Sequence, residues 1–228
     1  DMGEGTIALL NCELPALEMN SGMTIPSVPE FYALKNKLFE KKAILTDGEA
    51  AFDTSDVPVT TMEDGISYRE YGVPYFLNGF EGSDFMCQRY HTIADSKDTY
   101  SEDTFKTNVN WYGAYAIYVD TMPALELDLS QTAKELKAGL NEKFAKEAGV
   151  DTEEYMAAVD ELYAAGKAMN EKIAACNTAY EEAAASGDKD AKAKAREEGK
   201  ALNEKTLAAF QTVQASFLQI TDFGANYS

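Results

Sequence analysis

Two short apolar runs alternate with two stretches of helical spacing through the first 125 positions. The runs at 6–12 (TIALLNC) and 71–79 (YGVPYFLNG) are bounded by turn residues, which is typical of short buried strands. Between them, residues 29–42 carry apolar side chains at helical spacing behind Pro29. A further helix is expected from Ser101 to about Asp120, with acidic residues in its first turn and one apolar face formed by Phe105, Val109, Tyr112, Ala116 and Val119. The alternation of strand and helix predicts an α/β layer architecture for residues 1–125.

The pattern changes at residue 126, from which Ala, Glu and Lys dominate. Helices are expected from Ser130 to about 149, from 151 to about 185 and from about 190 to 218. Ser186-Gly187-Asp188 is a turn, so the last two helices form a long antiparallel hairpin. Two apolar stripes face each other across it and indicate a packed core: Tyr155, Val159, Leu162, Met169, Ile173, Cys176 and Tyr180 on one helix, and Ala201, Leu202, Leu207, Phe210, Val213 and Phe217 on the other.

Charge excludes some classes of partner. The formal net charge is −19, with 39 acidic and 20 basic residues, so no basic surface is available for nucleic acid or for an anionic membrane. No segment approaches the 18 apolar residues of a membrane-spanning helix. The part before residue 129 is the more acidic, which suits cation binding or simply keeps the chain soluble. Three scattered cysteines, without a CxxC pair, predict buried free thiols.

The only histidine, His91, stands in the stretch QRYHTIADSKDTY, residues 88–100. It follows an apolar strand and a glycine-rich loop, and it precedes a helix. Such loops at strand ends carry much of the chemistry of α/β proteins. Imidazole is a common zinc ligand, and the neighbouring Tyr90 offers a phenol that could stabilise an oxyanion. A hydrogen-bonded structural histidine or a surface histidine is the alternative.

Residues 72–105 resemble a segment of the di-zinc exopeptidases, a family that includes bacterial aminopeptidases, glutamate carboxypeptidases and a non-catalytic receptor. The resemblance rests on Gly72-Val73-Pro74 with its apolar strand, on Tyr90-His91-Thr92, on Asp95 and on the helix from Ser101. Thr54-Ser55-Asp56 is similar to the family's Ser-Asp segment. The resemblance implies that residues 1–125 are the carboxyl-terminal part of an aminopeptidase-like α/β/α sandwich, and that residues 126–228 are a helical extension.

The resemblance also implies a set of site residues. Asn11-Cys12-Glu13 is similar to the family's Asn-x-Asp ligand motif, with Glu in place of Asp. Glu13 and His91 would then bind the two zinc ions, and Tyr90 would hydrogen-bond the reaction intermediate. Ser55, Asp56 and Gly79 would contribute to a substrate pocket lined by residues 53–65 and 78–83. Glu13 as an ordinary acidic residue at a strand end is the alternative.

The family's remaining ligands, a His-x-Asp pair and a Glu-Glu pair with the general base, have no counterpart in this chain, which lacks a second histidine. We therefore expect a fragment of a zinc-dependent exopeptidase that is inactive alone. A non-catalytic receptor-like or assembly relative, and an acidic binding protein outside the family, remain open. The expected partners are a peptide substrate and, through the helices, a second copy or a missing amino-terminal segment. The expected location is the exterior of a bacterial cell.

Overall fold

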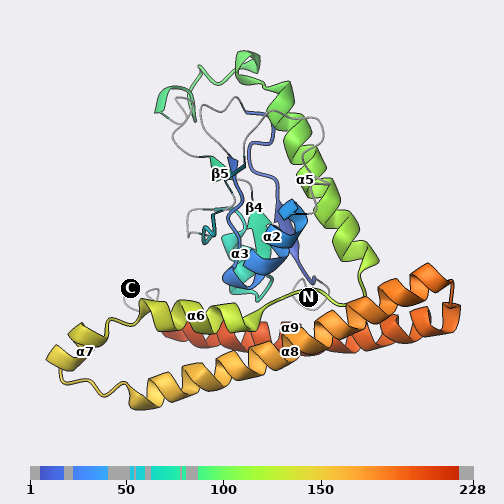
Figure 1. Cartoon of the computed structure of the whole chain (residues 1–228). Helices are drawn as coiled ribbons and strands as arrows, with labels where there is room; N and C mark the ends of the chain where they lie inside the picture. The colour runs from blue at the N-terminus through green and yellow to red at the C-terminus, as the bar shows by residue number, and fades with distance from the viewer. Residues whose placement is uncertain are drawn as a thin grey trace. The chain divides into compact units, whose positions relative to one another are not determined.

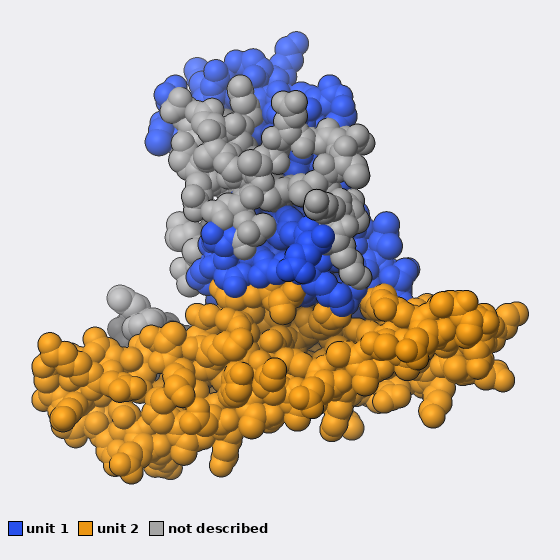
Figure 2. Space-filling view, viewed as in Figure 1, with its two compact units in different colours: residues 1–28, 34–121 blue, residues 29–33, 122–228 orange. Residues whose placement is uncertain are grey.

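The computed structural model describes residues 6–17, 23–40, 52–53, 55–59, 63–77, 79–80 and 87–220 (Figure 1). The chain divides into two compact units, which are coloured separately in Figure 2. Unit 1 consists of Asp1–Val28 and Leu34–Thr121, and unit 2 of Pro29–Ala33 and Met122–Ser228.

Unit 1 contains two small sheets among its described residues. Strand β1 (Leu9–Asn11) pairs in parallel with β4 (Tyr75–Leu77), so that Leu10 lies opposite Phe76. Strand β2 (Met23–Thr24) pairs in parallel with β3 (Phe52–Asp53) and antiparallel with β5 (Gly79–Phe80). Both predicted apolar runs therefore contain a strand, and each of these strands is only three residues long.

The predicted α/β/α sandwich is wrong. The described residues are mostly helical, and their strands of two or three residues belong to separate sheets of two and three strands. Apolar runs in the sequence indicate that a strand exists, but they do not fix its length or its number of neighbours. Here a turn follows Glu13 at once and Pro74 immediately precedes β4, so neither strand extends.

The core of unit 1 forms around α5 (Glu102–Thr121). The Trp111 ring is fully buried, stacks on Phe39 at 4.8 Å between ring centroids and meets Phe76 edge-on at 6.0 Å. Phe76 also packs edge-on against Tyr115. Other helical elements in the described part of this unit include the second part of α2 (Tyr32–Glu40, from Leu34 onward), the short α3 (Ile66–Glu70) and the 3-10 turn η2 (Lys97–Thr99).

The orientation of α5 differs from the one that the sequence pattern predicts. Its extent and its N-cap are confirmed, since the Ser101 hydroxyl accepts a hydrogen bond from the Thr104 amide. The predicted apolar face is correct at Tyr112, which is buried, and wrong at Phe105, Val109 and Ala116, which are exposed. The helix instead buries a half-polar face made of Thr104, Thr107, Asn108, Trp111, Tyr112, Tyr115 and Tyr118. Hydrophobicity alone did not identify this face because threonine, asparagine and tyrosine can be buried when their polar atoms are hydrogen-bonded.

Unit 2 is helical. The 3-10 turn η1 (Pro29–Phe31) packs on α6 (Leu129–Gly139), which is followed by α7 (Glu142–Glu147), α8 (Glu153–Ser186) and α9 (Lys189–Ile220). The two long predicted helices are thus present, and Gly187 joins them in the left-handed conformation that favours glycine. The single helix predicted to run from Ser130 to 149 is divided, because the Asn141 side chain caps a new helix by accepting a hydrogen bond from the Phe144 amide.

Two asparagines clamp an extended segment, Pro123–Leu125, to the α8–α9 hairpin. The Asn177 amide accepts a hydrogen bond from the Ala124 N–H (3.0 Å) and donates one to the Ala124 carbonyl (2.9 Å). Asn203 accepts from the Leu125 N–H (2.7 Å) and donates to the Pro123 carbonyl (3.1 Å). The two side chains therefore satisfy consecutive backbone groups as a neighbouring strand would.

Glycines inside α8 and α9 allow this close packing. A Cβ atom on Gly199 would collide with Pro123, and one on Gly166 would collide with the backbone of Ser130. Ala124, Ile173, Cys176 and Leu202 then close the core of the unit. Glycine in a helix interior costs stability, and here its small size is required by a neighbouring backbone.

We predict that Asn177→Ala destabilises the protein by about 2–4 kcal/mol, because it leaves a buried N–H and a buried C=O of Ala124 without partners. Urea unfolding followed by circular dichroism measures the change. Lys194→Ala, an exposed position on the partner helix α9, serves as the control and should change stability by less than about 0.5 kcal/mol. Equal stabilities of the two variants would contradict the role of the clamp.

Candidate functional site

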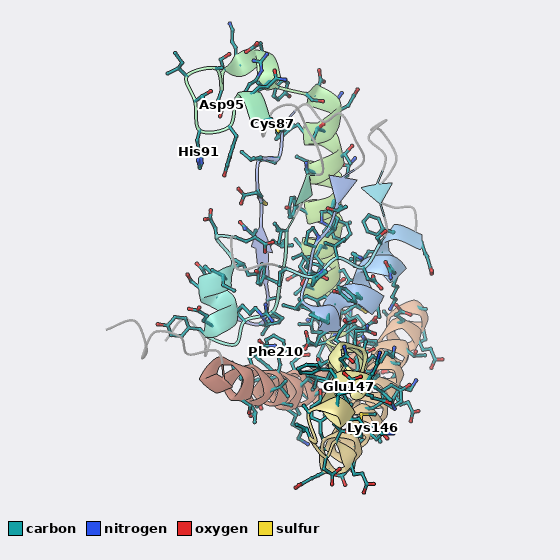
Figure 3. All side chains as sticks on the ribbon, turned by 90° about the vertical axis from the view of Figure 1, so that its left-hand side faces the viewer. Cys87, His91, Asp95, Lys146, Glu147 and Phe210 are labelled. Carbon is teal, nitrogen blue, oxygen red and sulfur yellow. The ribbon has the colours of Figure 1, made fainter. Side chains whose placement is uncertain are left out.

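The loop that carries His91 is held by its own hydrogen bonds. The Arg89 guanidinium donates to the Ala94 carbonyl (3.3 Å) and pairs with the Asp98 carboxylate (2.8 Å). The Thr92 amide and hydroxyl both donate to the Arg89 carbonyl. The Arg89–Asp98 pair joins the start and the end of the loop, and the Ser96 hydroxyl donates to the same Asp98 carboxylate. Figure 3 shows His91 and Asp95 on this loop, together with Cys87.

His91 has an uncommon backbone conformation in this loop. Its φ of 59° lies in the left-handed region, which few non-glycine residues occupy. Its ring stacks on Tyr90, with 3.8 Å between centroids and 21° between planes. The histidine is exposed and Tyr90 is half-buried. The loop therefore presents the imidazole to solvent against a fixed aromatic ring.

The segment that carries Glu13 is tied to α5. The Tyr112 hydroxyl donates to the Asn11 carbonyl (2.7 Å), and the Asn108 amide donates to the Pro15 carbonyl (2.9 Å). The Ser101 amide donates to the Ala16 carbonyl (2.8 Å). Glu13 is half-buried, and the next residue, Leu14, has a φ of 40°. Because the His91 loop leads directly into the same helix, α5 supports both predicted ligand segments.

The structure attaches Ser55 and Asp56 to α2. The fully buried ammonium group of Lys35 donates to the Ser55 carbonyl (2.8 Å) and pairs with the Asp56 carboxylate (3.0 Å). Asn36 donates to the same carboxylate (3.2 Å). Gly79 lies in β5, opposite Thr24. The predicted pocket residues 54, 60–62, 78 and 81–83 lie outside the described residues. The substrate-binding role of Ser55, Asp56 and Gly79 stays a prediction.

The described residues do not form a zinc site by themselves. Among them, no group of three or more His, Cys, Asp or Glu side chains could hold a metal ion. A protein zinc site needs at least three such ligands, and catalytic sites use histidine and carboxylates in this number. His91 and Glu13 are ligand types that zinc accepts, but they do not complete a coordination shell.

The cysteine prediction is correct for one thiol of the three. Cys176 is buried and its thiol donates to the Ala195 carbonyl (3.3 Å), whereas Cys12 and Cys87 are exposed. Cys12 directly follows β1, and Cys87 begins the His91 loop, so both lie where chain segments reach the surface. All three are free thiols.

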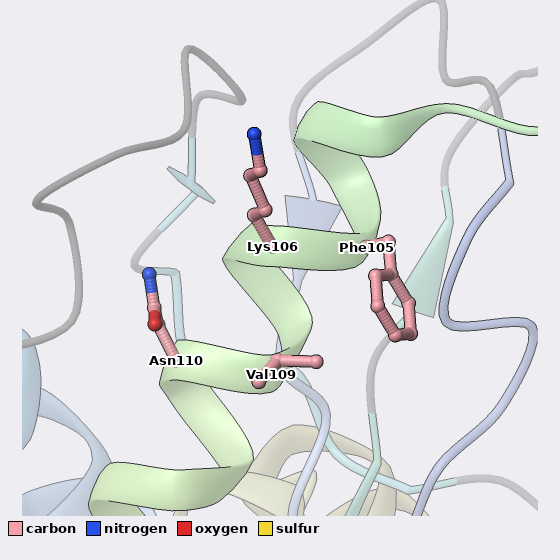
Figure 4. Close-up of a pocket in the computed structure, with 4 residues that line it drawn as sticks. All are labelled: Phe105, Lys106, Val109 and Asn110. Atoms are coloured by element: carbon pink, nitrogen blue, oxygen red, sulfur yellow. The ribbon is translucent and has the colours of Figure 1, made fainter.

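A cavity of about 350 Å³ lies beside α5. The described residues that line it are Phe105, Lys106, Val109 and Asn110, which occupy two successive turns of the helix (Figure 4). None of them is a predicted site residue. The cavity follows from the exposed apolar side of α5, a feature that the sequence pattern assigned to the core.

Comparison with known proteins gives no family. No protein-family description matches the sequence, and no curated protein matches it either. Within the part of the chain that the structure describes, no helix is both long and apolar enough to cross a membrane.

Three structurally important residues were missed by the reading of the sequence: Lys35, Asn177 and Asn203. Each lies on the buried side of a helix in a sequence position that a solvent-exposed polar residue could equally occupy. A polar residue at the spacing of the apolar stripe is the available signal for the two asparagines: Asn177 lies four residues after Ile173, and Asn203 lies four residues before Leu207.

We predict that Lys35→Met destabilises unit 1 by about 1–3 kcal/mol, although methionine fills a similar space. The Ser55 carbonyl loses its donor, while the half-exposed Asp56 carboxylate can regain water. Urea unfolding measures the loss. Lys134→Met, on the exposed side of α6, should change stability by less than about 0.5 kcal/mol. A neutral Lys35→Met would contradict the importance of the buried ammonium group.

The order of the His91 loop should depend on pH. Hydrogen bonds from Ser96 and from Arg89 lower the pKa of Asp98 from 3.8 to about 2. A lowered pKa means that the ionised carboxylate favours the closed loop. The contribution is therefore complete above about pH 4 and is lost as the pH falls toward 2. Amide hydrogen exchange at Thr92 and Thr99 should accelerate relative to unprotected peptides over this range.

The matched variant for this test is Asp98→Asn, whose loop amides should exchange fast at every pH. Amides of α8, such as that of Ile173, show whether unit 2 is still folded at low pH. If the pH-dependent change in loop exchange persists unchanged in Asp98→Asn, a titratable group other than Asp98 causes it.

Proposed function

We propose that unit 1 supplies two ligands, His91 and Glu13, to the zinc site of an exopeptidase, and that the other ligands are carried by a different polypeptide segment. The substrate class is a peptide cleaved at one of its ends. Chain 1–228 alone is inactive in this proposal, because it contains no second histidine and its described residues form no complete ligand group.

The observation that carries the proposal is backbone strain. Among the described residues, His91 and Leu14 are the only non-glycine residues with a positive φ. Strained residues persist where the surrounding structure enforces them, and they concentrate at functional sites. One of the two is the candidate ligand His91 and the other directly follows the candidate ligand Glu13, although the ligands were chosen from sequence motifs alone.

The surroundings of His91 also suit a metal ligand. A ligand must be accessible and held in one orientation before the metal binds. The imidazole is exposed, its backbone is fixed by the Arg89 bonds, and the Tyr90 ring stacks against it. In this proposal Tyr90, whose ring stacks on the ligand, offers its phenol to a substrate oxygen.

Zinc titration of chain 1–228 tests the proposal. Because His91 is the single histidine, its ring protons form an isolated pair of signals in the NMR spectrum. We predict that zinc shifts these signals in a saturable way, and that Glu13→Gln weakens the binding at least about threefold by removing an anionic ligand. Peptidase assays with terminally free peptides should show no zinc-dependent turnover by the chain alone.

The control variant is Glu70→Gln, which removes an exposed carboxylate of unit 1 at the end of α3, outside the predicted pocket segments. Its zinc affinity should equal that of the unmodified chain. Equal effects of Glu13→Gln and Glu70→Gln would mean that zinc binds through the overall negative charge and not at a site. Zinc-dependent hydrolysis by the chain alone would overturn the proposal that the site is incomplete.

A further inference from the structure

The outer face of α5 is apolar and exposed. Phe105 is 41% exposed, Val109 51% and Ile117 65%, while the opposite face of the helix is buried in unit 1. Val109, Gly113 and Ile117 follow one another at intervals of four residues and form a continuous stripe. A helix that buries one face in its own unit and exposes an apolar stripe on the other is characteristic of an element packed on both sides.

The described residues do not explain the glycine at position 113, at the centre of this stripe. A Cβ atom added there would meet none of their atoms within 4 Å, so no described neighbour requires a glycine. Glycine in a helix interior costs about 0.5–1 kcal/mol relative to alanine. At the other glycines inside long helices, Gly166 and Gly199, a Cβ atom would collide with a neighbouring backbone. Gly113 therefore resembles a contact position whose neighbour comes from outside the chain.

We propose that a second copy of the chain packs its α5 antiparallel against this face, with the two helices crossing at Gly113. This interface is independent of the zinc proposal. Self-association places identical surfaces together, so the face must complement itself under a twofold rotation. The arrangement of α5 around Gly113 meets this condition for its apolar and for its charged residues.

The apolar residues match first. In an antiparallel pair centred on Gly113, residues equally far before and after it lie at the same level. Val109 then lies opposite Ile117 of the second copy, and the same contact repeats on the other side of the axis. The two glycines meet at the centre, where the missing side chains let the backbones approach closely. Rows of residues at intervals of four are the ridges by which helices commonly pack.

The charged residues match in the same arrangement. Lys106 and Asp120 are each seven residues from Gly113, so Lys106 of one copy lies opposite Asp120 of the other, twice per dimer. In the single chain, Lys106 pairs with Glu102 in the preceding turn, at 2.7 Å. In the dimer, the Asp120 carboxylate of the second copy would be a second partner for the Lys106 ammonium group. Opposite charges at matching positions favour the second copy over an unrelated apolar partner.

Sedimentation velocity of chain 1–228 at concentrations up to about 1 mM, where even a weak dimer is populated, tests the interface. We expect a monomer–dimer equilibrium. Gly113→Leu should weaken the dimer at least about tenfold by separating the helices. Gly113→Ala should raise the melting temperature, because alanine favours helix and meets no atom of its own chain, and should still weaken the dimer.

Charge reversal identifies the register. Lys106→Glu and Asp120→Lys should each weaken the dimer, and the double variant should restore it, because the pair is re-formed with its signs exchanged. Glu171→Lys, at an exposed position of α8, is the control. It changes the net charge by the same amount as Asp120→Lys, but it should not reproduce the register-specific effect on the dimer.

Two outcomes would overturn the proposal. A chain that stays monomeric at about 1 mM would mean that a different polypeptide covers the face. A dimer that is insensitive to Gly113→Leu, or that the double charge reversal does not restore, would mean that the copies associate through another surface.

Discussion

The packing of Trp111 is the interaction on which unit 1 depends. Its ring lies between Phe39 of α2 and Phe76 of β4, and so joins a helix and a strand to α5. Replacing a buried aromatic residue of this size by alanine typically costs about 3–5 kcal/mol. The same helix then uses Tyr112 and Asn108 to hold the Glu13 segment, and it follows directly from the His91 loop. Both candidate ligand segments are therefore attached to the helix that Trp111 anchors in the core.

Polar side chains replace regular sheet at several points of this protein. In unit 2, Asn177 and Asn203 bond the backbone of the extended segment 123–125. In unit 1, Lys35 bonds the backbone at Ser55. Each arrangement solves the same problem, which is that a buried extended backbone needs partners for its N–H and C=O groups. The side chains of Lys35, Asn177 and Asn203 provide them where the described strands are too short to do so.

The sequence predicts the helices better than the sheets. The helices at 102–121, 153–186 and 189–220 were expected from the spacing of apolar residues and from Ser101 and Gly187 at their ends. The predicted sandwich was wrong, because the length and number of strands depend on which segments pair with each other. The local sequence pattern carries no information about that pairing. The buried face of α5 was misassigned because threonine, asparagine and tyrosine outnumber aliphatic residues on it.

The candidate site was predictable only in part. Motif resemblance selected His91, Tyr90 and Glu13, and the structure adds the conformation of the His91 loop and the strained residue after Glu13. Neither could be derived from sequence, because a positive φ at histidine or leucine has no local signal comparable to that of glycine. Asp56 was selected by the same resemblance, yet its carboxylate is bound by Lys35 and Asn36, a contact that depends on tertiary packing.

The separation between the Glu13 carboxylate and the His91 ring in a zinc-soaked crystal of the chain is the most direct test of the account. Ligands of two zinc ions in one exopeptidase site lie within about 7 Å of each other, given bonds near 2.1 Å and the usual metal spacing. The account predicts this separation, with anomalous zinc density between the two side chains. Side chains that point to opposite surfaces, with zinc bound elsewhere, would contradict it.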